Sequence, residues 1–196
     1  MINEIFIALP ILILFVIIYH ILDRNRAVKE NWQKLSQMLG LKFSQEGFLS
    51  FVSNKLEGTY RDHYLNLYTY LKQYGRHSRR FTKLIVKIKN QKGVSLKIYP
   101  ENFISKIEKT FGMQDISLGN ENFDKEFIVK GNNEKFVREI LSCSIQMKIL
   151  NTKNFNLGVN GEKAEFEEQK VIIDINRLRA IIDLTIDIAE KIESIN

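Results

Sequence analysis

The feature that most constrains this chain is an uncharged apolar run at its start. No Asp, Glu, Lys or Arg lies between Ile5 and Leu22. As a helix this run of about 18 residues is about 27 Å long, close to the thickness of about 30 Å of a bilayer's hydrocarbon core. It also has no polar face, which argues against a helix that is half buried on a protein core. The sequence therefore predicts a transmembrane helix over residues 1–22.

The residues beside the run distinguish an uncleaved anchor from a cleaved signal peptide. A signal peptide needs a basic start and a cleavage site of small residues, whereas Glu4 precedes this run and Asp23 follows it. Basic residues follow the run and none precedes it, so the positive-inside rule predicts that the rest of the chain faces the cytoplasm. These topology residues are Arg24, Arg26 and Lys29. The prediction is a single-pass protein of the inner or plasma membrane, with its N-terminus outside.

The first half of the remaining chain carries a helical pattern and then a strand pattern. Apolar residues at helical spacing before Gly40 predict a juxtamembrane helix over residues 23–40, with Trp32 packed in the core rather than in an interfacial belt. Between Leu41 and Pro100 the apolar residues alternate with polar ones, and turn residues interrupt them. Connections this short suit antiparallel pairing. The pattern predicts an antiparallel meander of about four or five strands.

The second half adds helices and a hairpin, which makes the fold class α+β. A short helix is expected over 101–111. A mid-chain helix is also expected, with a buried apolar stripe that includes Cys143. In that stripe Cys143 acts as a small hydrophobic residue rather than as a reactive thiol. Asn160-Gly161 is a strong signal for a late hairpin. An amphipathic C-terminal helix is expected from about Asp174. No linker or repeat divides residues 41–196, which we take as one cytoplasmic domain.

Several short motifs are shared with known sequences. They are Leu39–Phe43, Leu56–Tyr60 and Phe123–Val129, together with Trp32 and Gly131. In these the chain resembles a family of uncharacterised, single-span, membrane-anchored bacterial proteins that carry a domain of unknown function. The resemblance implies a shared fold and anchor, and it brings no catalytic residue.

Motifs of known catalytic, metal or cofactor sites are absent from the sequence. It has no paired histidines on a helix, no phosphate-binding loop, no nucleophile elbow and no dinucleotide fingerprint, so no cofactor and no metal is predicted. The acids Asp183, Asp187 and Glu190 share one face of the last helix, where a solvated surface is expected rather than a cation site. Asp124 is expected to accept hydrogen bonds in a turn.

Charge is distributed unevenly along the chain. The segment from His63 to Pro100 contains nine Lys and Arg and no acid, whereas the segment from Glu162 to Glu193 is acidic. A hairpin with its tip near Gly75 would gather the basic side chains on one surface. The residues predicted for this surface are Lys72, Arg76, Arg79, Arg80, Lys83, Lys87 and Lys89.

These patterns predict a membrane-anchored, non-enzymatic binding module whose basic surface meets anionic lipid or an acidic protein. A nucleic acid is the less favoured partner, and a solvated edge hairpin without a ligand is also compatible with the pattern. One alternative is a membrane-tethered hydrolase or phosphoryl-handling enzyme that uses Asp115 and Asp124 with basic residues. Another is an accessory subunit of a membrane complex.

Overall fold

A computed structural model describes residues 2–47, 52–101 and 113–195, with side chains from Pro10 onward. The helices are α1 (Ile2–Leu39), α2 (Glu121–Glu126), α3 (Glu134–Ile140), α4 (Cys143–Thr152) and α5 (Ile175–Ser194). The strands are β1 (Lys42–Glu46), β2 (Ser53–Tyr60), β3 (His63–Tyr74), β4 (His77–Lys87), β5 (Leu96–Pro100), β6 (Gln114–Asp115), β7 (Phe127–Gly131), β8 (Asn156–Asn160) and β9 (Lys163–Glu168).

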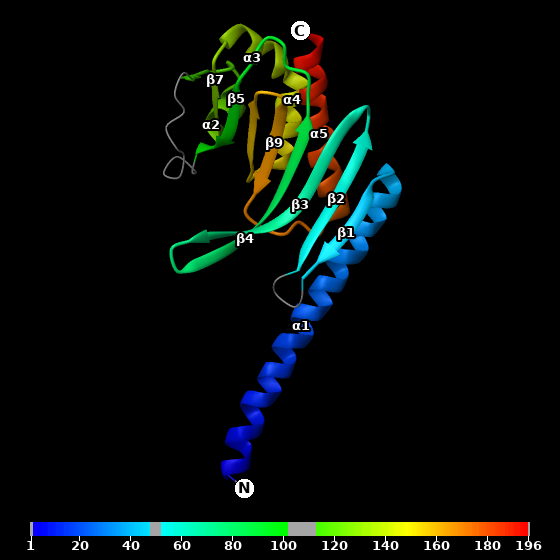
Figure 1. Ribbon diagram of the computed structural model, residues 1–196. Helices are drawn as coiled ribbons and strands as arrows, with labels where there is room; N and C mark the ends of the chain where they lie inside the picture. The colour runs from blue at the N-terminus through cyan, green and yellow to red at the C-terminus, as the bar shows by residue number, and fades with distance from the viewer. Residues whose placement is uncertain (1, 48–51, 102–112, 196) are drawn as a thin grey trace.

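The described strands form one antiparallel sheet of nine strands in the order β1-β2-β3-β4-β9-β8-β5-β7-β6 (Figure 1). The first four strands pair in chain order, as the alternation of apolar residues predicts. However, β5 does not join β4, because the β8–β9 hairpin from the end of the chain lies between them. One large sheet therefore replaces the predicted meander of four or five strands.

Tight turns set the register of the hairpins. Arg61 and Asp62 connect β2 to β3 with φ angles of 49° and 62°, a left-handed conformation that few side chains adopt. Gly75 takes the same region, at 57°, between β3 and β4. In the late hairpin, Asn160 pairs with Lys163, so the turn residues are Gly161 and Glu162 rather than the predicted Asn160-Gly161.

Helices α1, α4 and α5 pack on one face of the sheet, as the arrangement in Figure 1 shows. Trp32 of α1 is fully buried, and its indole Nε1–H donates to the carbonyl oxygen of Ile172 at 3.0 Å. The predicted core position of Trp32 is therefore confirmed. Asp174 caps α5, and nine of that helix's side chains face the core. The opposite face of the sheet carries the polar members of each strand's alternation.

The apolar run at the start of the chain belongs to α1, which continues without a break to Leu39. Among the residues that the structure describes, no helix is long and apolar enough to cross a membrane. The predicted transmembrane helix, and with it the single-pass membrane class, is therefore wrong.

The mid-chain helix also differs from its prediction. Leu141 and Ser142 separate α3 from α4, so a single apolar stripe does not continue through both helices. The buried residues in the second helix are Ile145, Gln146, Ile149 and Thr152, while Cys143 is exposed at its first position. The prediction of a buried Cys143 is wrong because the helix restarts there in a new register. The short helix predicted over 101–111 lies outside the described residues, apart from Glu101.

Candidate functional site

The most exposed part of the sheet is the end of the β3–β4 hairpin. The pairing of β2 with β3 extends along β3 only to Tyr68, and β9 pairs with β4 only from Thr82 onward. Residues 70–81 therefore continue as a two-stranded ribbon, in which Leu71 lies opposite Arg80 and Tyr74 opposite His77. Figure 1 shows this end of the hairpin projecting away from the sheet. We call residues 70–81 the basic ribbon.

An aromatic cluster stiffens the basic ribbon on one face. The ring centroids of Tyr70 and Phe81 lie 5.5 Å apart, and those of Tyr74 and Phe81 lie 6.2 Å apart. The ammonium group of Lys72 sits 5.7 Å from the centre of the Phe81 ring. A lone two-stranded hairpin is marginally stable in water, so these contacts stabilise the projecting conformation. In this cluster Phe81 is buried, whereas Tyr74 remains 43% exposed.

The cations of the ribbon have different surroundings. Arg76 is exposed at the turn, and Arg79 donates to the side-chain oxygen of Gln169 at 3.1 Å. Arg80 is half-buried and donates to the carbonyl oxygen of Val52. Burial lowers the pKa of the Arg80 guanidinium, and the nearby charge of Arg24 on α1 lowers it further. In the described part of the chain, Lys72, Arg76, Arg79 and Arg80 have no carboxylate partner, so the ribbon carries uncompensated positive charge.

The remaining residues predicted for the basic surface lie elsewhere on the sheet. Lys83 pairs with Glu165 of β9 at 2.8 Å, and the Lys87 ammonium lies 5.1 Å from the centre of the Tyr64 ring. The backbone N–H of Lys89 donates to Glu193. The acidic end of the chain thus folds against the basic segment at β4. Arg24 joins the site instead, while Arg26 and Lys29 are also exposed on α1.

The carboxylates considered for catalysis are engaged in local structure. Asp115 forms an ion pair with Lys130 at 2.8 Å. Asp124 accepts hydrogen bonds from the Ser117 hydroxyl and from the backbone N–H groups of Leu118 and Gly119, at 2.7–3.0 Å. Burial raises the pKa of the Asp124 carboxyl, but these hydrogen bonds outweigh it and hold the pKa below its ordinary value. The expectation that Asp124 accepts hydrogen bonds in a turn is confirmed.

This lowered pKa predicts a pH dependence of stability. The folded protein stabilises the ionised form of Asp124 more than the unfolded chain does. The contribution of this carboxylate to the free energy of unfolding is therefore full above about pH 5, and it is lost as the pH falls below about 4, through the pKa of the folded state. We expect Asp124→Asn to remove part of the wild-type loss of stability between about pH 5 and 3, measured by urea unfolding. Asp62→Asn, at an exposed turn, serves as the control. Identical acid profiles for wild type and Asp124→Asn would contradict this role.

The acids of α5 hold the β2–β3 turn in place. Arg61 forms ion pairs with Asp187 at 2.9 Å and with Glu190 at 2.6 Å, and the Tyr60 hydroxyl donates to Asp183 at 3.3 Å. Within the described ranges, no group of three His, Cys, Asp or Glu side chains could hold a metal ion. These acids therefore act as a structural contact between the turn and the helix.

Comparisons with known proteins bear on the fold. No family model matches this chain, and no curated protein matches it. A solved structure, the crystal structure of the mycobacterial trehalose monomycolate transport factor A, TtfA, superimposes with a TM-score of 0.59 at 8% sequence identity. The match covers 85% of this chain and 94% of that one. The chain thus shares the fold of a bacterial protein.

Proposed function

We propose that this chain is a non-enzymatic binding module whose basic ribbon docks on the headgroup layer of an anionic lipid bilayer. The observation that carries the proposal is the projection of uncompensated cations beyond the sheet, beside exposed apolar side chains. Leu71 and Tyr74 are each 43% exposed on the ribbon, within a few residues of Arg76 and Arg79. An element that offers cations and apolar groups together suits the boundary between headgroups and acyl chains.

The same geometry favours lipid over a nucleic acid. Sequence-tolerant binding of single strands depends on bases that stack on open aromatic faces. In the ribbon, the rings of Tyr70 and Phe81 pack against each other at a tilt, and the Lys72 ammonium lies over the Phe81 ring. At a membrane interface, tyrosine typically places its hydroxyl among the polar headgroups, and leucine reaches toward the acyl chains. The cations then contribute about 1 kcal/mol each near an anionic surface.

The test is flotation of the full chain with vesicles, which separates bound protein from aggregates. Wild-type protein is expected to float with vesicles of phosphatidylglycerol and phosphatidylcholine, and the floating fraction should fall as the salt concentration increases. With vesicles of phosphatidylcholine alone, the protein should not float. Arg76→Glu combined with Arg79→Glu is expected to weaken partitioning at least about 30-fold, from the loss of about 2 kcal/mol of attraction. Both substituted side chains are exposed, so the fold should be retained.

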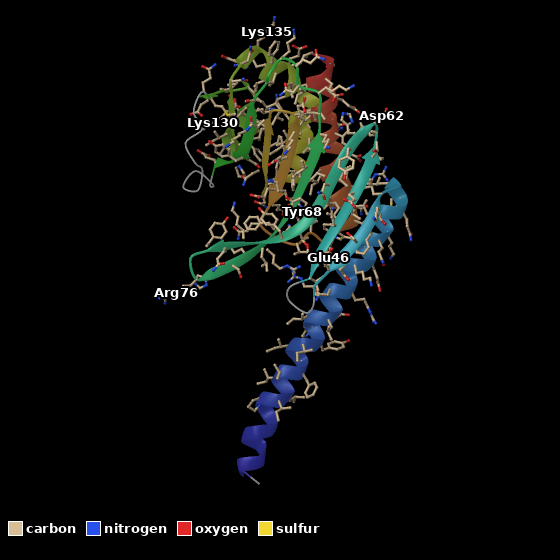
Figure 2. All side chains as sticks on the ribbon, in the orientation of Figure 1. Glu46, Asp62, Tyr68, Arg76, Lys130 and Lys135 are labelled. Carbon is tan, nitrogen blue, oxygen red and sulfur yellow. The ribbon has the colours of Figure 1, made fainter. Side chains whose placement is uncertain are left out.

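The control variant is Lys125→Glu combined with Lys135→Glu, which changes the net charge by the same amount. Both lysines are exposed, and Figure 2 shows Lys135 at the far end of the molecule from Arg76. We expect this variant to float like wild type. Equal losses in both variants would show net charge rather than the ribbon to be responsible. Retention of an anionic duplex DNA without any flotation would overturn the lipid assignment.

A further inference from the structure

One edge of the nine-stranded sheet is β1, which pairs with β2 on one side only. On its other side, the backbone N–H and C=O groups of β1 have no hydrogen-bond partner among the residues that the structure describes. Helix α1 contacts β2 and α5 as well as β1, so it lies over the face of the sheet rather than beyond this edge. An unpaired strand edge is a template for pairing with a second chain.

The side chains of β1 alternate between the two faces of the sheet. Ser44 and Glu46 line a shallow hollow on the polar face, and alternation places Lys42 on that face too, whereas Phe43 packs against the core. Lys42 and Glu46 are exposed, and within the described ranges neither forms an ion pair. The strand therefore presents an unpaired cation at one end and an unpaired anion at the other, each two residues from Ser44.

These charges are complementary to a second copy of the same strand. When Ser44 of one copy lies opposite Ser44 of the other in an antiparallel pair, Lys42 of each copy lies opposite Glu46 of the other, on the same face. A register shifted by two residues removes both ion pairs, and a shift by four places like charges opposite each other. Charges on an edge strand usually oppose pairing, but here they favour one register of self-pairing.

We propose that two copies of this chain pair through β1, antiparallel about a two-fold axis at Ser44, so that the sheet continues from one copy into the other. The pairing gives hydrogen-bond partners to the backbone groups of both edges and ion-pair partners to the charges at both ends. The axis lies perpendicular to the sheet, so the two basic ribbons point in opposite directions. The pairing therefore does not depend on docking by the basic ribbon.

A disulfide bond at the axis tests the register. The variants carry Cys143→Ser, which removes the native cysteine. In that background Ser44→Cys is expected to cross-link two copies on mild oxidation, because opposite Cα atoms of an antiparallel pair lie about 4.5–5.5 Å apart, within the range of disulfide bonds. Thr59→Cys, exposed on β2 away from the edge, is the matched control and should remain a monomer on a gel without reductant. Equal cross-linking of the two variants would overturn the proposal.

Charge substitutions test the pairing by sedimentation of the full chain, in a non-ionic detergent that covers the exposed apolar side chains of α1. Wild type is expected to dimerise reversibly. Lys42→Glu or Glu46→Lys alone should weaken dimerisation at least about tenfold, because like charges then face each other at both ends of the pair. Both substitutions in one chain should restore it. A mixture of the two single variants should form heterodimers, since the acids of one copy then face the lysines of the other.

The control for net charge is Lys125→Glu, at an exposed position of α2, which should dimerise like wild type. Circular dichroism should show the same fold for all variants, because each substituted charge is exposed. Association through α1 would not respond to the charges of β1. A wild type that stays monomeric, or a dimer that both single substitutions leave unchanged, would therefore overturn the proposal.

Discussion

Replacing Trp32 with alanine is expected to lower the free energy of unfolding by about 3–5 kcal/mol. The indole is fully buried between α1 and the core, so the substitution removes its apolar area and leaves a cavity. It also removes the donor to the carbonyl oxygen of Ile172, just ahead of α5. Two helices therefore lose a contact at once. Equilibrium urea unfolding, followed by circular dichroism, measures the change.

Two further variants separate the causes. Trp32→Phe keeps most of the apolar volume and loses the hydrogen bond, so a smaller loss of about 1–3 kcal/mol is expected. Met38→Ala, on the same helix but 57% exposed, should change stability by less than about 0.5 kcal/mol. A loss below about 1 kcal/mol for Trp32→Ala would contradict the packing of α1 against the sheet.

The second large effect is expected at Glu168, at the end of β9. This carboxylate is 3% exposed and forms ion pairs with Arg177 at 2.7 Å and Lys170 at 2.8 Å. Arg177 also donates to the carbonyl oxygens of Thr152 and Lys153 at the end of α4. The arginine thus connects α4, α5 and β9. Glu168→Gln is expected to cost about 3 kcal/mol, because it leaves a partly buried guanidinium without its charge partner.

An exposed ion pair provides the comparison for this prediction. Glu134 and Arg138 form a pair one helical turn apart on α3, at 2.8 Å. Glu134→Gln should cost no more than about 0.5 kcal/mol, and less at high salt. The loss at Glu168 should change little with salt, since the site is shielded from solvent. Similar costs for the two substitutions in urea unfolding would show that burial does not strengthen the Glu168 contacts.

Local patterns were sufficient to predict the elements but not their order in the sheet. Alternation between Leu41 and Pro100 predicts strands that pair with their neighbours, because short turns determine that pairing. The insertion of β8 and β9 beside β4 joins residues about 80 positions apart, and no local signal reports such a contact. The turn at Arg61 and Asp62 was also missed, since aspartate tolerates the left-handed conformation but the arginine before it does not ordinarily mark such a turn.

The candidate site was predicted only in part, because local patterns indicate its cations but not the long-range contacts that neutralise some of them. The acid-free segment identified the ribbon cations Lys72, Arg76, Arg79 and Arg80. It could not show that Glu165 would neutralise Lys83, because that pair forms only through the sheet order. Arg24 was assigned to membrane topology, and its place beside Arg80 follows from packing of α1 on the sheet.

The sheet order also bears on how the protein is made. In the described chain, β5, β7 and β6 connect to the first four strands only through β8 and β9. In a chain synthesised from its N-terminus, the edge of β4 can pair with β9 only after residues 163–168 have been added. That edge carries Lys83 and Lys87, and charged side chains oppose pairing with a neighbouring chain. The lysine that pairs with Glu165 in the folded sheet is thus also a charge that opposes edge-to-edge pairing of β4 while β9 is absent.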